Sequence, residues 1–166
     1  METGVSTAHL DDDNPERFVP LRRTLGVTSF GLNQILLRPG ERGRIHAHES
    51  QEEVYLVLSG TLTLEVEGEE RDLAAGELAR VAPEVRRRLT NRGPGVCRLL
   101  AIGGAGEHSG RDGRAYTDWD DDAPRPPQEI PLPEDLPASE LREACPGVSR
   151  RGSSRGAPRP WRRDPR

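Results

Sequence analysis

Alternation of apolar and polar side chains is the feature that most limits how this chain can fold. In residues 61–67, Leu62, Leu64 and Val66 alternate with threonine and glutamate. Side chains of a β-strand point alternately to its two faces, so this pattern predicts a strand with one buried and one solvated face. Between residues 18 and 104, no window sustains the apolar repeat of an amphipathic helix.

Glycine-bearing turns divide the same region into short predicted strands. The strands are expected within residues 27–37, 43–48, 53–73, 76–83, 84–91 and 95–104. The stretch 53–73 holds two strands joined at Ser59 and Gly60, followed by a second turn at Glu67 and Gly68. Short strands at close, regular spacing predict an all-β sandwich or closed barrel, architectures that protect exposed strand edges.

Composition separates this core from both ends of the chain. Hydrophobic residues make up 33% of the sequence and aromatic residues 4%, low values for a globular protein, and the apolar residues concentrate in the middle. Residues 1–17 are acidic and polar, which predicts a flexible arm, and residues 18–119 are expected to hold the barrel. Residues 120–166 are rich in proline and arginine, which predicts a disordered tail with at most a short helical turn over 138–147.

Charge and targeting signals point to a cytoplasmic protein without a nucleic-acid or membrane partner. The formal net charge is −4, and all 24 basic residues are arginine, which we interpret as a compositional bias of the coding genome. The seven arginines of residues 148–166 are a weak handle for RNA, and a solvated tail is the preferred interpretation. The first 18 residues lack the basic start and apolar stretch typical of a signal peptide, and no apolar run of the sequence is long enough to cross a membrane.

The strongest chemical signal is a pair of histidines followed by a glutamate. His46 and His48 are two residues apart, so in a strand their side chains point to the same face. Four residues then form a turn before Glu53, which shares its strand face with Tyr55. Two imidazoles and a carboxylate are a suitable ligand set for iron, manganese, nickel or zinc.

These residues resemble the two sequence motifs of the cupins, a family of small jelly-roll (double-stranded β-helix) barrels. The first motif is matched throughout by Gly40, His46, His48, Glu53 and Gly60. The second is matched in part by Gly76, Glu77, Val81, Pro83 and Asn91. The resemblance covers roughly residues 32–102. It implies a cupin-like barrel that holds a divalent metal or a small molecule, and a homodimer.

The second motif departs from the family at the position of its third histidine, which is Arg87 here. Strand parity predicts that Arg87 projects into the barrel with Val85 and Leu89, while Arg86 and Arg88 lie in solvent. A buried guanidinium needs a partner, because an unpaired charge in an apolar interior costs several kcal/mol.

Two interpretations of Arg87 remain open from the sequence. In one, Arg87 forms a bidentate pair with Glu53 and the barrel is metal-free. In the other, His46, His48 and Glu53 hold the metal, and Arg87 binds an anionic group of the ligand, with Tyr55 as a hydrogen-bond donor.

Three classes of function follow from these interpretations. The first is a metal-dependent enzyme acting on a small metabolite. The second is a non-catalytic ligand-binding or sensory barrel, and the third is a dimeric interaction scaffold that uses the charged tails. Among the remaining polar residues, Cys97 is expected to be a buried thiol and Asn91 a turn residue, while His9 and His108 are expected to be exposed.

Overall fold

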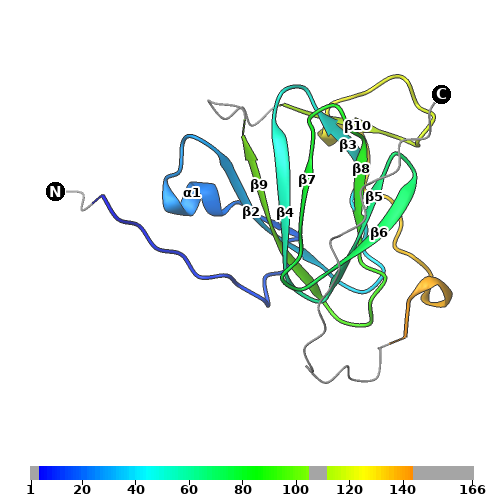
Figure 1. The fold of residues 1–166 in the computed structure, drawn as a ribbon, viewed down its shortest axis with the longest axis horizontal. Helices are drawn as coiled ribbons and strands as arrows, with labels where there is room; N and C mark the ends of the chain where they lie inside the picture. Colours follow the sequence, from blue (N-terminus) through cyan, green and yellow to red (C-terminus); the bar gives the residue numbers. More distant parts are fainter. Residues whose placement is uncertain (1–3, 105–111, 144–166) are drawn as a thin grey trace, which may run out of the picture.

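The computed structural model of this chain describes residues 4–104 and 112–143, which form two facing antiparallel sheets (Figure 1). The first sheet has the order β1 (Phe18–Val19), β2 (Gly31–Leu37), β9 (Cys97–Gly104), β4 (Glu52–Ser59) and β7 (Leu78–Val81). The second has the order β10 (Gly113–Tyr116), β3 (Ile45–His48), β8 (Arg87–Thr90), β5 (Thr61–Val66) and β6 (Glu69–Ala74). The helical elements are short: α1 (Leu21–Leu25) and the 3₁₀ turns η1 (Pro127–Glu129) and η2 (Ala138–Glu140). The predicted all-β barrel is confirmed, and no described helix is long enough to span a membrane.

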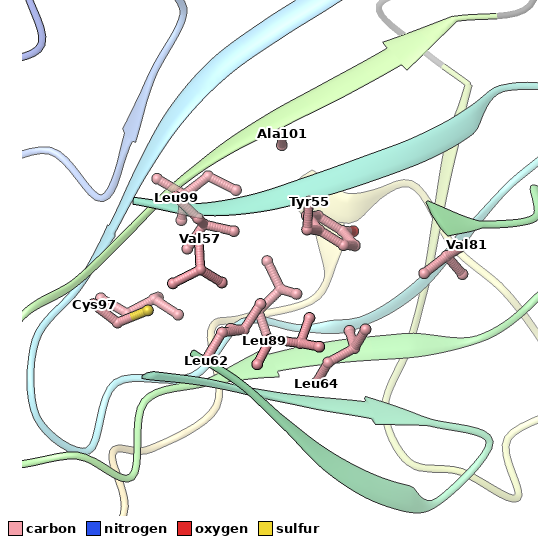
Figure 2. Close-up of a cluster of buried hydrophobic side chains, with 12 residues drawn as sticks. Tyr55, Val57, Leu62, Leu64, Val81, Leu89, Cys97, Leu99 and Ala101 are labelled. Carbon is pink, nitrogen blue, oxygen red and sulfur yellow. The ribbon is translucent and has the colours of Figure 1, made fainter. Parts of the chain in front are cut away.

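The core lies between the two sheets and is built by the inward halves of the alternating strands (Figure 2). Tyr55 and Val57 enter it from β4, and Leu62 and Leu64 from β5, all with no exposed surface. The other buried members of this cluster are Ile35, Leu37, Leu73, Val81, Leu89, Cys97, Leu99 and Ala101. The alternation visible in the sequence therefore predicts which side chains form the core, but the expected solvated face of β5 was wrong, because Thr63 is 1% and Glu65 7% exposed.

The turn between β4 and β5 depends on a glycine. Gly60 has φ of 76°, in the left-handed region that favours glycine. A Cβ atom at this position would lie 2.8 Å from the carbonyl oxygen of Val96 and 2.9 Å from the Cα of Cys97. The close approach of β9 to this turn therefore leaves no room for a side chain at Gly60.

A second, smaller cluster lies on the outer face of the second sheet. It consists of Ile45, Ala47 and Tyr116, with Trp119 packed against them. The segment that follows β10, residues 117–143, covers this face and is called the covering segment below. Its Ile130 is only 4% exposed.

The covering segment changes the environment of two arginines that were expected in solvent. Their side chains do point outward, but Arg86 and Arg88 are only 20% and 19% exposed. The guanidinium of Arg86 lies 4.1 Å from the ring centroid of Tyr116, and that of Arg88 lies 5.6 Å from the ring centroid of Trp119. The solvent prediction was wrong because strand parity cannot show that a distant segment covers the outward face.

Both ends of the described chain contact the barrel. The Gln34 side chain donates to the backbone oxygen of Asp11 and accepts from its amide, at 2.9 Å and 3.1 Å. At the other end, the amide of Leu136 donates to Gly40 at 2.9 Å, and Leu136 is 8% exposed. Residues 120–143 are therefore docked on the barrel, whereas the sequence predicted a disordered tail. Burial of Ile130 and Leu136 stabilises this docking. The mobility of residues 1–17 stays a prediction.

Several expected features fall outside the described residues. These are His108, the basic stretch 148–166, and the end of the helical turn expected over 138–147, of which the structure describes η2. Of the other polar residues, Asn91 is buried and its side chain donates to Leu37 and Gly95, both at 2.7 Å, as a turn residue does. His9 is exposed.

Candidate functional site

The candidate site is assembled from the inward faces of both sheets. His46 and His48 come from β3 and Arg87 from β8, where Arg87 pairs directly with His46 across the strands. Glu53 and Tyr55 come from β4 in the facing sheet. The period of two along each strand turns these side chains inward, so residues 41 positions apart in the sequence become neighbours.

One oxygen of Glu53 is the centre of this arrangement. Its Oε2 lies 3.7 Å from Nε2 of His46 and 3.4 Å from Nε2 of His48. The same oxygen accepts a hydrogen bond from the Tyr55 hydroxyl at 2.5 Å and from Nη2 of Arg87 at 3.0 Å. All five side chains that the sequence selects are therefore brought together.

The neighbours of Glu53 keep its carboxylate charged. Burial acts to raise its pKa, but hydrogen bonds from His46 and His48 and the charge of Arg87 outweigh burial and hold the pKa well below its usual value. Burial, followed by the Glu53 charge, raises the pKa of Tyr55 well above its usual value, so Tyr55 remains a neutral donor. Burial is also the main cause of the lowered pKa of His46, which favours a neutral imidazole.

Arg87 is fully buried, and four of its five N–H donors have a partner. Nη1 donates to the carbonyl oxygens of Pro83 and Val85 at 3.1 Å and 3.0 Å, and Nη2 donates to Glu53. Nε lies 3.4 Å from the Tyr55 hydroxyl oxygen. The contact with Glu53 uses one carboxylate oxygen, whereas the first of the two interpretations of the sequence has a bidentate pair.

The second nitrogen of each imidazole faces an oxygen. Nδ1 of His46 lies 3.2 Å from the backbone oxygen of Arg44. Nδ1 of His48 lies 3.4 Å from Oδ2 of Asp112, although the angle does not make it a hydrogen bond. Without a metal, the Nε2 atoms carry the protons that face Glu53; transfer of these protons to the Nδ1 atoms would free both Nε2 lone pairs for a metal.

Asp112 is the residue of this site that the sequence did not indicate. It follows a glycine-rich stretch without periodicity, and only its position beside β10 brings it to His48. Its carboxylate is 7% exposed and accepts from the Ser50 hydroxyl at 2.8 Å and the Gln51 amide at 2.9 Å. These contacts hold it in place next to the imidazole.

The donor set fits a divalent transition metal. His46, His48 and Glu53 each offer one ligand atom, and these atoms lie within 4.8 Å of one another. Ligand bonds of about 2.0–2.2 Å place such atoms roughly 3.0–3.5 Å apart, close to the separations from Glu53 Oε2. Arg87 opposes binding, because a positive charge about 5 Å from a divalent cation costs on the order of 6 kcal/mol at an effective dielectric constant of 20.

A cavity of about 1150 Å³ opens beside this cluster and is lined by His48, Glu53 and Asp112 among others. The further lining residues that matter below are Arg22, Arg23, Glu49, Glu52, Gly113, Arg114 and the segment Pro124–Gln128. Arg87 and Tyr55 do not line it. The cavity is large enough for a small organic molecule that reaches His48 and Glu53.

Two facing antiparallel sheets, with histidines and a glutamate between them, define a small-molecule-binding β-barrel. Residues 33–103 match the cupin domain family. The match spans 71 of the 166 residues, so the similarity to the cupin family is that of this region of the chain.

Solved structures share the fold. A cupin protein from Bacteroides fragilis is 24% identical, with a TM-score of 0.56 over 72% of this chain and 96% of its own. A sugar phosphate isomerase of the cupin superfamily from Silicibacter pomeroyi is 21% identical, with a TM-score of 0.55 over 83% of this chain and 93% of its own. Identities this low establish the fold alone.

Among curated proteins, the chain is similar to the polyketide synthase CurC from Streptomyces cyaneus. The two are 32% identical over 77 residues, which is 46% of this chain. The matched stretch spans 50% of the relative's length.

Proposed function

We propose that this protein binds a small organic anion in the barrel cavity, next to a divalent metal held by His46, His48 and Glu53. The observation that carries the proposal is the convergence of three ligand atoms within 4.8 Å at the edge of a cavity of about 1150 Å³. A metal in this position would act as a Lewis acid toward a bound oxygen atom of the ligand.

The residues around the three ligands have defined tasks in this proposal. Arg44 and Asp112 orient the imidazoles, and Tyr55 and Arg87 fix the Glu53 carboxylate by donating to Oε2. Because Arg87 is buried and Tyr55 already donates to Glu53, we assign both to positioning Glu53, in place of the direct ligand contact expected from the sequence.

A metal-free ligand-binding barrel is the second candidate, and it is favoured by one specific contact. The ion pair between Arg87 and Glu53, at 3.0 Å with Arg87 fully buried, satisfies both charges without a metal. In this case the cavity binds its ligand through side chains alone and carries out no metal-dependent chemistry.

The chemical class of the ligand is supported by the similarity to polyketide synthase CurC. The similarity supports a ligand derived from a polyketide chain, a molecule with closely spaced carbonyl groups. A divalent metal beside such a ligand would bind neighbouring carbonyl oxygens.

Metal analysis of protein purified without chelators distinguishes the two candidates. We expect about one equivalent of a transition metal per chain, and its loss in the variant His46→Ala. His9→Ala is the matched control, because His9 is exposed. If the protein carries no metal and shows no heat of binding on titration with Zn²⁺, Mn²⁺, Fe²⁺ or Ni²⁺, the metal site is rejected and the metal-free barrel is supported.

A further inference from the structure

The charges that line the cavity do not balance once their partners are counted. Four arginines and four carboxylates line it. Three of the carboxylates pair with arginines: Glu49 with Arg114, Glu52 with Arg80, and Glu53 with Arg87. These pairs leave Arg22, Arg23 and Arg125 against the carboxylate of Asp112. The charge of Asp121, which interacts with Arg125 from outside the lining, reduces the excess from two positive charges to one. This excess favours an anion in the cavity.

The excess charge lies on the rim of the cavity. Within the described part of the chain, the side chains of Arg23 and Arg125 have neither a hydrogen bond nor an ion pair within 4 Å, and both are exposed. Arg22 uses its Nε to donate to the backbone oxygen of Val27 at 3.1 Å. Arg87, in contrast, has no exposed surface and donates to protein oxygens. An incoming anion therefore meets the rim arginines first.

The strand register places Arg125 on the side of the histidines. Ala115 of β10 is the direct partner of His46 on one side and of Arg125 on the other. The bridge to Arg125 has two backbone hydrogen bonds, of 2.9 Å and 3.0 Å. Directly opposed residues of neighbouring strands point to the same face. Arg125 thus lies two strand spacings, about 10 Å, from His46 and shares its face.

Small residues separate Arg125 from the histidines: Gly113 lines the cavity between Arg125 and His48, whereas Ala115 is fully buried. Ala115 lies between Arg125 and His46, and Gly113 is the direct partner of His48. A Cβ atom on Gly113 would lie 3.3 Å from Cγ of Pro127 and 3.9 Å from Cε1 of His48. Pro127 and the imidazole therefore border the same opening.

The backbone around Arg125 is restricted. Pro124 and Pro126 flank it, which fixes their φ angles. Burial of Ile130 anchors the same segment to the outer face of the sheet. A backbone restricted in this way loses less conformational freedom when the Arg125 side chain binds an anion.

We propose that Arg125 is the anion-binding residue of the cavity and takes a carboxylate or phosphate group of an organic ligand whose other end reaches His48 and Glu53. This inference rests on the proposed function, in that it places the ligand in the same cavity. The sequence suggested Arg87 of the second motif as the anion-binding residue. Arg125 lies instead in a segment beyond the matched cupin domain.

Binding of three matched aromatic probes to chelator-treated protein tests the proposal. The probes are benzoate, phenyl phosphate and the neutral benzamide, followed by ligand-observed NMR. We expect wild-type protein to bind at least one of the two anions more tightly than benzamide. Arg125→Gln is expected to raise the Kd of that anion at least tenfold and to leave the Kd of benzamide unchanged, because only the charged fork is lost.

Two variants make the result specific. Arg125→Lys keeps the charge without the planar fork and should give an intermediate Kd. Arg38→Gln is the control, since Arg38 is a partly exposed arginine that pairs with Glu41 and does not line the cavity. Anion binding to Arg125→Gln within twofold of wild type, or no anion binding to wild type at 20 mM, would overturn the proposal.

The outcome is separable from that of the metal experiment. Chelator-treated protein contains no metal, so Arg125-dependent anion binding stands even if metal analysis is negative. A phosphate preference over carboxylate identifies a phosphorylated ligand, and the reverse identifies a carboxylic acid.

Discussion

Arg87 determines what the cluster in this barrel can hold. It occupies the position where the resemblance to cupins predicts a third histidine, and it donates to the carboxylate that would bind a metal. A guanidinium has no lone pair to offer a metal, so the site has one ligand fewer. Its positive charge also repels a cation held by His46, His48 and Glu53.

Arg87→His is therefore expected to increase metal affinity. The substitution replaces a buried positive charge by a neutral imidazole opposite His46, and we expect the Kd for Zn²⁺ to fall at least tenfold by calorimetry. Arg88→His, one residue further and on the outer face, is the control and should not change it. An unchanged Kd in Arg87→His would show that the repulsion is already compensated.

Cys97 is predicted to be chemically inert in the folded protein. It is fully buried, and burial raises the pKa of its thiol to about 12, so the reactive thiolate is scarce near neutral pH. In a Cys145→Ser background, iodoacetamide at pH 8 should leave Cys97 unmodified in native protein and alkylate it fully in guanidinium chloride. Rapid alkylation of the native protein would contradict the buried position.

The residue scale also shows what parity can and cannot predict. The alternation around Arg87 predicts its inward direction, because direction is a local property of a strand. Parity could not predict that Arg86 and Arg88 are covered, since their cover comes from Tyr116 and Trp119, about 30 residues away. Asp112 was missed for the same reason.

Among the elements, the strands were predictable and the connections that cross them were not. β4 and β5 correspond to the two strands predicted within residues 53–73, because alternation and glycine turns are encoded locally. β6 follows the predicted turn at Glu67 and Gly68 but was not predicted as a strand of its own. α1 has only five residues, too few for a periodic signal, and β10 follows a glycine-rich stretch and has no apolar alternation. β10 is a strand because β3 and the covering segment complete its hydrogen bonds.

Gly60→Ala tests the turn that joins β4 to β5. A Cβ atom 2.8 Å from the Val96 oxygen, combined with φ of 76°, should lower the free energy of unfolding by more than about 2 kcal/mol. Urea unfolding measures this change. Gly68→Ala is the control, because Gly68 also has a positive φ, of 84°, but has no atom within 4 Å of its Cβ position. The difference between the two variants isolates the contact with β9.

The covering segment is tested by Ile130→Ala. Ile130 is 4% exposed, so truncation should weaken docking of the segment by about 2 kcal/mol, which corresponds to roughly 30-fold faster exchange of the Arg125 amide hydrogen. Leu132→Ala is the matched control in the same segment, since Leu132 is 43% exposed. Equal exchange rates in both variants would argue against docking through Ile130.

For the whole molecule, the charged cluster links stability to pH. The folded-state pKa of Glu53 lies well below its usual value, so its contribution to stability is present above about pH 4.3, the usual value for an unfolded glutamate. The contribution is lost as the pH falls from there toward the folded-state pKa. Unfolding titrations between pH 7 and 3 should show a smaller loss of stability in Glu53→Gln than in wild type.

Glu69→Gln is the control for this pH dependence, because Glu69 is exposed at the start of β6. Its titration should follow that of wild type. If Glu53→Gln followed wild type as well, the carboxylate would not be stabilised by its neighbours in the folded protein.

The segment beyond the matched domain, held to the barrel by Gly40, Ala115 and Ile130, supplies one wall of the cavity. Its attachment uses main-chain hydrogen bonds, side-chain hydrogen bonds from Arg42 and Arg44, and a few apolar side chains, none of which belongs to the five side chains gathered around Glu53. Substitutions in this wall can therefore alter which compounds bind in the cavity, while His46, His48 and Glu53 keep their positions. Ligand selectivity in such a protein can evolve through substitutions in this segment, without changes to the strands of the barrel.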